Sequence, residues 1–195
     1  MNNPEQFDFS TPVACADLRK PEIFEQFYKQ FSSKIYRYAF LRLSSADDAE
    51  ELLSTAFLRL WEYVSRDKEI NEKNAGVGVV RNLPAFLYRI ARNLIIDQYR
   101  ARAKTPPLSL DLLLQSGFEA ADCAPLNTVL RAEHALVLAQ FDNLSSDERD
   151  LLVLRYVEAV PVKEIAQIYE ITENTASVRI YRALQKLKGL LKQSG

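Results

Sequence analysis

The chain has 195 residues and a formal net charge of −1, and 48% of its residues are hydrophobic and 26% are charged. This length and apolar content are enough for one domain or two small ones, each with a modest core, and they exclude disorder throughout. Two cysteines without CxxC spacing exclude a disulfide framework, and with no signal pattern and no membrane-length apolar run we expect a soluble protein of a reducing cytoplasm.

The composition predicts helices from the start of the chain. Five glycines and few alternating runs of Val, Ile and Thr, against many Leu, Ala, Glu, Arg and Lys, favour an all-α fold. Residues 1–20 are expected to be loosely ordered, and 22–43 to form the first helix. A second helix is expected to follow a serine cap, Ser44 or Ser45, and its acidic first turn suits the positive end of the helix dipole.

The third predicted helix carries an unusual cluster of cations. The segment 66–82 is polar and contains two glycines, so it is expected to form a long loop before Pro84 starts this helix. Residues 86–104 hold five basic side chains against the single acid Asp97. At about 100° per residue, the apolar side chains gather on one face. The outward face is expected to present Tyr88, Arg89, Arg92, Asn93, Tyr99 and Arg100.

The segment 105–130 is the predicted linker. It begins with Pro106 and Pro107 and contains no Lys or Arg. Because proline stops helices and this stretch differs in charge from both flanks, we expect two helical domains on a tether, 21–104 and 131–195.

Residues 144–188 have the layout of a helix-turn-helix. Ser145 and Glu148 fit a capping box, Pro161 fits the first turn of the next helix, and Thr172 fits the cap of the third. On the last helix of this segment, which follows Thr172, an apolar face lies opposite a face with Arg179, Arg182 and Lys186. Ser177, Val178 and Tyr181 border that face. This division is typical of a recognition helix, although an amphipathic helix in a bundle or dimer interface also shows it.

Three motifs in a fixed order resemble the extracytoplasmic-function class of bacterial RNA polymerase sigma factors. They are "DAEELLSTAFLRLW", "FLYRIARNLIIDQYR" and "EIAQIYEITENTASVRIYRALQKL", and the resemblance covers about residues 20–192. It implies that 21–104 is region two and 131–195 is region four, with 105–130 as a flexible linker. It also implies binding to core RNA polymerase and promoter DNA, no catalytic activity, no cofactor or metal, and by analogy an anti-sigma factor as a further partner.

The resemblance assigns roles to residues of the first domain. The helix over 84–103 would engage the minus-ten promoter element and help to separate its strands, with Asn93 contacting a base and the arginines gripping phosphate. Exposed rings there are expected to stack on unpaired bases; the alternative for Tyr88 and Tyr99 is that they are half-buried rings that shield the core edge. The surface that docks on the polymerase clamp would comprise Asp48, Glu51, Leu52 and Phe57, with core packing the simpler role for Phe57.

In the second domain the resemblance places the helix after Thr172 in the major groove of the minus-thirty-five element. The matching positions are Thr175, Ser177, Val178, Arg179, Tyr181, Arg182 and Lys186. The chain also departs from the family pattern at several positions. Ser54-Thr55 replaces a usual Gln-Glu, and Glu170 replaces a usual Gly, so the turn at Glu170 must change its geometry or accept strain.

Two other classes of function fit the sequence less well. A helix-turn-helix regulator that never joins polymerase explains 144–192 equally well but leaves the basic helix and the acidic turn unused. An enzyme has no support in the sequence, because His134 is the only histidine and no phosphate-binding loop or nucleophile–base pair is present.

Overall fold

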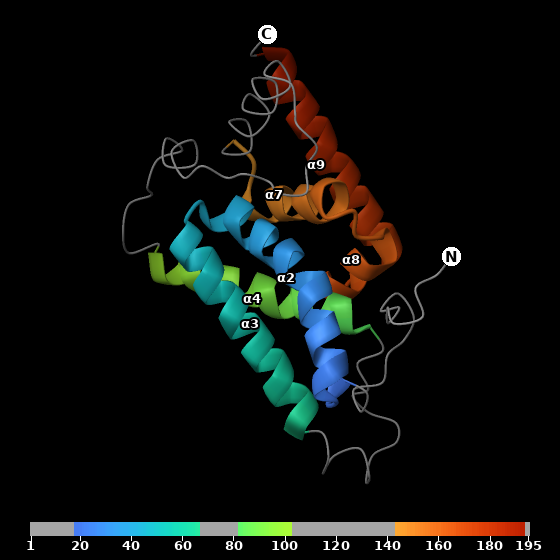
Figure 1. Ribbon diagram of the computed structural model, residues 1–195. Helices are drawn as coiled ribbons and strands as arrows, with labels where there is room; N and C mark the ends of the chain where they lie inside the picture. The colour runs from blue at the N-terminus through green and yellow to red at the C-terminus, as the bar shows by residue number, and fades with distance from the viewer. Residues whose placement is uncertain (1–17, 67–81, 103–142, 194–195) are drawn as a thin grey trace, which may run out of the picture. The chain divides into compact units, whose positions relative to one another are not determined.

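The computed structural model in Figure 1 describes residues 18–66, 82–102 and 143–193. Within these ranges every regular element is a helix, which confirms the predicted all-α class. None of the helices in the described ranges is long and apolar enough to cross a membrane. The expected linker 105–130, the residue His134 and nearly all of the expected loop 66–82 lie outside the described residues.

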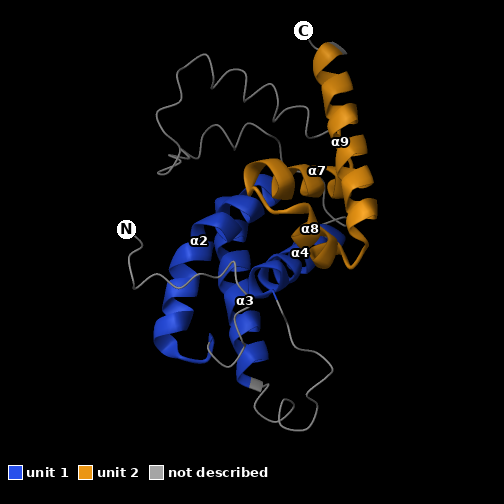
Figure 2. Cartoon of the chain, turned by 90° about the vertical axis from the view of Figure 1, so that its right-hand side faces the viewer, with its two compact units in different colours: residues 1–106 blue, residues 107–195 orange. Residues whose placement is uncertain are grey.

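The chain divides into two compact units, residues 1–106 and 107–195, coloured separately in Figure 2. Unit 1 contains the helices α2 (Pro21–Leu43), α3 (Ala46–Arg66) and α4 (Leu83–Arg102), and each of the three packs on the other two. Its core consists of side chains that are at most 2% exposed, including Phe27, Ile35, Tyr38, Leu52, Leu60, Leu87 and Ile95. Burial of these apolar side chains is the main source of stability in a unit of this size.

Local signals fix the helix ends of unit 1. α2 begins with Pro21, whose missing N–H has no partner to lose there, and ends where Ser44 adopts a left-handed conformation with φ 55°. The Ser45 hydroxyl accepts a hydrogen bond of 3.3 Å from the Asp48 amide, which confirms one of the two predicted serine caps. At the start of α4 the cap is Asn82, whose Oδ1 accepts from the Ala85 amide at 2.9 Å.

Residues 18–20, the end of the segment expected to be loosely ordered, are anchored to unit 1. Leu18 is fully buried, and Arg19 Nε donates a hydrogen bond of 2.6 Å to the carbonyl oxygen of Val64, near the end of α3. The free carbonyls at the end of a helix need donors, so Arg19 stabilises the C-terminal end of α3.

Unit 2 contains α7 (Ser146–Leu152), a π-helical turn η1 (Val153–Val157), α8 (Val162–Tyr169) and α9 (Glu173–Gln193). The predicted capping box is present: the Ser145 hydroxyl accepts from the Glu148 amide at 3.3 Å, and Glu148 Oε2 accepts from the Ser145 amide at 2.8 Å. Thr172 Oγ1 accepts from the Thr175 amide at 3.2 Å, so the predicted cap of the third helix is also confirmed. α8 and α9 form the predicted helix-turn-helix, and the π turn before them was not predicted.

Within the described residues of unit 2, two residues other than glycine adopt a left-handed backbone conformation. Ala159 has φ 54° and Glu170 has φ 56°, and each lies where a helical segment ends. The turn at Glu170 therefore keeps the geometry that glycine usually provides and accepts the strain. Glu170 also makes side-chain or electrostatic contacts, whereas Ala159 has only its methyl group.

Replacing Ala159 with glycine is expected to stabilise unit 2 by about 1 kcal/mol, because the clash of Cβ in the left-handed region disappears and outweighs the added freedom of the unfolded chain. Thermal unfolding of the full chain measures the change. Glu170→Gly is the matched comparison and should gain less, since it also loses the contacts of the glutamate. A lower unfolding temperature for Ala159→Gly would contradict the interpretation of strain.

Candidate nucleic-acid interface

The outward face of α4 presents cations and an amide, as predicted. Asn93 and Arg100 are exposed, and Arg89 and Arg92 are half-buried. The Arg89 guanidinium carbon lies 5.0 Å from the centre of the Phe86 ring, which holds this cation against the helix. Arg100 Nη1 lies 3.7 Å from Asp97 Oδ1 in an exposed pair that a phosphate can displace at little cost.

Tyr88 does not lie on this face, and its predicted exposure is wrong. Its side chain is only 3% exposed and packs edge-to-face on Tyr38, with ring centroids 5.6 Å apart. The helical period explains the position: seven residues turn the helix by about 700°, so Tyr88 lies within about 20° of the buried Ile95. The same arithmetic on the sequence could have found it. Tyr88 therefore supports the basic face from inside unit 1.

Tyr99 is half-buried and is also bound to the scaffold. Its hydroxyl donates a hydrogen bond to the carbonyl oxygen of Arg42, and the Arg42 guanidinium carbon lies 5.6 Å from its ring centre. Arg42 is itself buried near the end of α2. Tyr99 thus joins the C-terminal end of α4 to that of α2, and stacking on a base would require it to give up these contacts.

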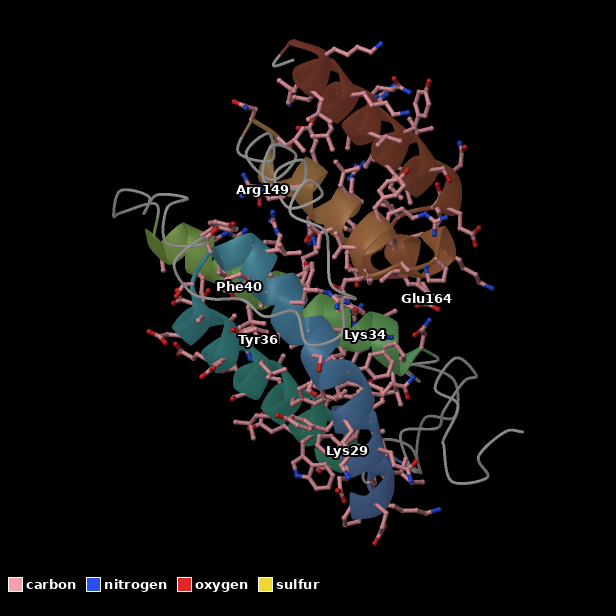
Figure 3. All side chains as sticks on the ribbon, turned by 45° about the horizontal axis from the view of Figure 1, so that its top comes forward. Lys29, Lys34, Tyr36, Phe40, Arg149 and Glu164 are labelled. Atoms are coloured by element: carbon pink, nitrogen blue, oxygen red, sulfur yellow. The ribbon has the colours of Figure 1, made fainter. Side chains whose placement is uncertain are left out.

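The first turn of α3 is acidic and influences α2. Figure 3 labels Tyr36 and Phe40 on α2, where their rings stack with centroids 6.1 Å apart. Burial raises the pKa of Tyr36 above its ordinary value, and the negative charges of Glu50 and Asp47 raise it further. The acidic turn is therefore a local source of negative potential, opposite in sign to the face of α4.

Only part of the predicted clamp-docking set is accessible. Glu51 is exposed and Asp48 half-buried, but Leu52 and Phe57 are 2% and 4% exposed and belong to the core. The Phe57 ring lies 4.7 Å from that of Tyr28 and 6.3 Å from that of Phe27. Placing Leu52 at the surface was wrong, because it lies on the inward stripe of α3, and core packing is confirmed for Phe57.

Leu58 is the apolar residue that the sequence reasoning missed. It is 58% exposed and lies on the outer face of α3. Leu58 follows Glu51 by seven residues, which is about two turns, so the two side chains lie on one line along the helix. An acidic residue with an exposed leucine on one line is a feature that a partner surface could bury.

The outward face of α9 agrees with the sequence prediction. Its buried side is formed by Ala176, Ile180, Ala183 and Leu187. The exposed side carries Ser177, Val178, Arg179, Tyr181, Arg182 and Lys186, with Tyr181 62% exposed. Thr175 is half-buried, and its hydroxyl lies 2.8 Å from that of Thr172. α9 thus has the apolar back and the polar, cationic front that major-groove binding requires.

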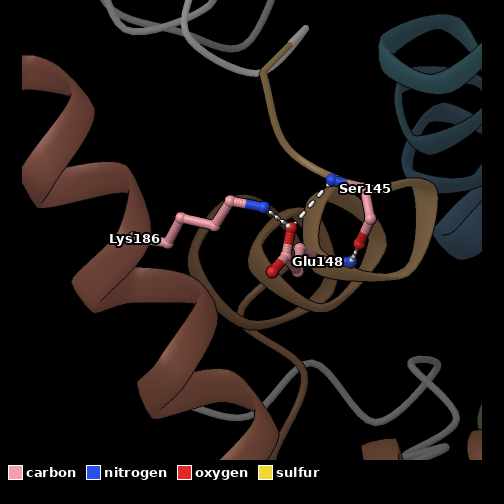
Figure 4. A network of polar contacts seen from close by, with 3 residues as sticks. All are labelled: Ser145, Glu148 and Lys186. Atoms are coloured by element: carbon pink, nitrogen blue, oxygen red, sulfur yellow. Dashed lines mark hydrogen bonds and ion pairs between the residues drawn. The ribbon is translucent and has the colours of Figure 1, made fainter.

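Lys186 differs from the two arginines because it is paired within unit 2. Its Nζ lies 2.7 Å from Glu148 Oε2, the same oxygen that accepts from the Ser145 amide (Figure 4). Burial acts to raise the pKa of Glu148, but the hydrogen bonds from Lys186 and Ser145 and the charge of Lys186 prevail, so the pKa is below its ordinary value.

This lowered pKa predicts a loss of stability in acid. A carboxyl whose pKa is lower in the folded state contributes its stabilisation above the unfolded value, about 4.3, and loses it as pH falls through the folded value. We expect thermal unfolding of Glu148→Gln to depend less on pH than that of the parent between about pH 5 and 3. Glu25→Gln is the control. The pKa of Glu25 is also lowered, but its pair with Lys29 is exposed, so this substitution should change the pH dependence of unfolding less than Glu148→Gln does. Equal pH dependence of Glu148→Gln and the parent would contradict the prediction.

Comparisons with known proteins identify relatives over most of the chain. The family model "Sigma-70 region 2" matches residues 27–105, and "Sigma-70, region 4" matches residues 134–187. The ECF RNA polymerase sigma factor SigW of Bacillus subtilis is 30% identical over 172 residues, which cover 83% of this chain and 85% of SigW. SigM of the same organism is 26% identical over 166 residues, which cover 85% of this chain and 93% of SigM.

Two solved structures have the same fold. The sigma factor RpoE in complex with the anti-sigma factor NepR from Bartonella quintana gives a TM-score of 0.60 at 20% identity and covers 87% of this chain and 96% of RpoE. CnrH in complex with the cytosolic domain of CnrY gives a TM-score of 0.64 at 20% identity and covers 93% of this chain and 96% of CnrH.

Proposed function

The chain belongs to the extracytoplasmic-function class of sigma-70 RNA polymerase sigma factors, and from this premise we propose how its two units share promoter recognition. A sigma factor binds core RNA polymerase and directs transcription initiation at promoters. A regulator that used the helix-turn-helix alone would leave the region 2 match over 27–105 without a role.

In our proposal, α9 binds the major groove of the minus-thirty-five element. Ser177, Val178 and Tyr181 face base edges, with the methyl groups of Val178 suited to a thymine methyl. Arg179 and Arg182, about 60° apart on one flank of this face, bind phosphates and fix the register of the helix. The observation that carries this assignment is the exposed cationic front of α9 opposite its buried apolar back.

α4 acts at the minus-ten element in the same proposal. Asn93, the exposed amide of the basic face, reads a base edge, and Arg89, Arg92 and Arg100 hold the backbone. Tyr88 and Tyr99 position this face from within unit 1. The protein needs no chemistry of its own, because binding energy separates the strands and polymerase catalyses synthesis. It works in the bacterial cytoplasm, where polymerase and promoters are.

The partner surfaces follow from the same assignment. Glu51 and Leu58 on the outer face of α3 dock on the polymerase clamp, with Asp48 beside them. An anti-sigma factor is an expected further partner by analogy with RpoE, which was solved with the anti-sigma factor NepR. Such a protein would compete for the faces of α3, α4 and α9.

Reconstitution with core RNA polymerase tests the function. Core enzyme from a related bacterium is mixed with the purified chain and a library of genomic fragments, and RNA 5′ ends are sequenced. Initiation is expected at a small set of sites that share two sequence elements, and core enzyme alone should not produce it. The absence of directed initiation on every fragment would contradict the sigma function.

Asn93→Ala should relax base preference at one minus-ten position. The lost amide contact is worth about 1–3 kcal/mol of discrimination between bases. Rates of strand opening, followed by permanganate reactivity on promoters with single base changes, measure it. Asn93 is exposed, so the substitution should leave the unfolding temperature within a degree or two of the parent. Unchanged preference at every minus-ten position would remove Asn93 from the interface.

A further inference from the structure

The pair between Lys186 and Glu148 joins α7 to α9. Glu148 Oε2 accepts from Lys186 Nζ at 2.7 Å and from the Ser145 amide at 2.8 Å, so one carboxylate oxygen serves both the α7 cap and α9 (Figure 4). The side chains of Lys186 and Glu148 are 45% and 29% exposed. The contact is therefore at the surface but partly sheltered from water.

The pair lies beside the apolar contact between the same two helices. Leu144 and Leu152 from the α7 side form one buried cluster with Ala183 and Leu187 of α9. Lys186 is the neighbour of Leu187 in the sequence, and Glu148 lies between the two leucines of the α7 side. The ion pair thus closes the polar edge of the contact that sets the position of α9 on α7.

Lys186 also lies far from the start of the recognition helix. It follows Glu173, the first residue of α9, by thirteen positions, or about 20 Å along the axis. Residues that contact bases in helix-turn-helix proteins come from the N-terminal part of this helix. Arg182 is one turn nearer to that part, is exposed, and makes no ion pair with any described residue.

The charge of Glu148 opposes a phosphate near Lys186. To bind phosphate, the ammonium group would have to leave a carboxylate at 2.7 Å or share itself between two anions that repel each other. A cation already neutralised inside the protein releases no counterion from DNA when the complex forms.

We propose that Lys186 is a positioning residue, which holds α9 on α7 through Glu148, and that the phosphate-binding stripe of α9 ends at Arg182. The proposal rests on the proposed function, because it concerns how α9 is presented to the minus-thirty-five element. It removes Lys186 from the predicted DNA contacts.

The salt dependence of promoter binding tests this proposal. Holoenzyme is assembled with the parent, Lys186→Gln or Arg182→Gln, and its affinity for the most active fragment of the reconstitution experiment is measured over a range of KCl concentrations. Each lost phosphate contact reduces the slope of log K against log[salt] by about 0.9. Arg182→Gln is expected to show this reduction and Lys186→Gln to keep the parent slope. A reduction of about 0.9 for Lys186→Gln would overturn the proposal.

A thermal unfolding cycle gives a second, independent test. Lys186→Gln and Glu148→Gln should each lower the unfolding temperature. The double variant should be about as stable as the less stable of the two single variants, because each substitution removes the same Lys186–Glu148 interaction. Additive losses would overturn the positioning role. If the assembled holoenzyme binds no promoter, or if Arg182→Gln keeps the parent slope, the proposed function of α9 fails. The unfolding cycle alone then decides the role of Lys186.

Discussion

Leu52→Ala is expected to lower the free energy of unfolding of unit 1 by about 2–5 kcal/mol, the range for a leucine truncated in a packed core. Leu52 is 2% exposed and lies on the inward stripe of α3. The removed methyl groups lose their burial and leave a cavity between α3 and its neighbours. This loss is a large fraction of the stability of a small domain.

Leu58→Ala is the matched control on the same helix. Leu58 is 58% exposed, so its truncation should change stability by no more than about 0.5 kcal/mol. If Leu58 docks on polymerase, the same change should weaken the binding of core enzyme by about tenfold or more, since burial of a leucine side chain is worth about 1.5–3 kcal/mol.

Trp61 provides the measurement. It is the only tryptophan of the chain and lies in unit 1, where its ring centroid is 4.9 Å from that of Phe24. Urea unfolding followed by its fluorescence therefore reports on unit 1 within the full chain. Polymerase affinity is measured on the same samples. Normal unfolding of Leu52→Ala together with weakened polymerase binding would show that Leu52 is a docking residue after all.

Local signals in the sequence predicted the helices and most of their starts. Ser145 with Glu148, and Thr172 with Thr175, are close in sequence, so the hydrogen bonds that begin α7 and α9 depend on few other residues. The π turn at Val153–Val157 was missed because its apolar residues continue the pattern of an ordinary helix. The bond from the Glu158 amide to the Val153 carbonyl, 3.0 Å long, is visible only in the structure.

The faces of the helices were predicted less well at their borders. Tyr88 and Tyr99 are amphipathic, so composition does not decide whether the ring packs inside or faces solvent. The helical period alone places Tyr88 beside the buried Ile95, but the half-buried position of Tyr99 depends on Arg42, which is distant in the sequence. The partner of Lys186 is similarly distant, thirty-eight residues earlier, and nothing near Lys186 distinguishes it from Arg182. The sequence therefore identified the candidate DNA-contacting residues, but it did not identify the residues of the protein that some of them contact in the folded state.

The double variant Arg179→Gln with Arg182→Gln should weaken promoter binding by about 10- to 100-fold, since hydrogen bonds to charged groups contribute about 1.5–3 kcal/mol each and part of this is recovered by water. The slope of log K against log[salt] should fall by about 1.8, which corresponds to two phosphates. Because phosphates carry no sequence information, the loss should be nearly equal on all promoters.

Lys188→Gln is the matched control for this double variant. Lys188 is an exposed cation of the same helix, but it follows Arg182 by six residues, about 9 Å along the axis, and so lies beyond the N-terminal part of α9 that is proposed to contact DNA. It should keep both the affinity and the slope of the parent. A reduced slope for Lys188→Gln would mean that cations along the whole length of α9 attract DNA, rather than a stripe that ends at Arg182. An unchanged slope for the double variant would mean that α9 does not meet the phosphates through Arg179 and Arg182, and the assignment of its exposed side to the major groove would be withdrawn.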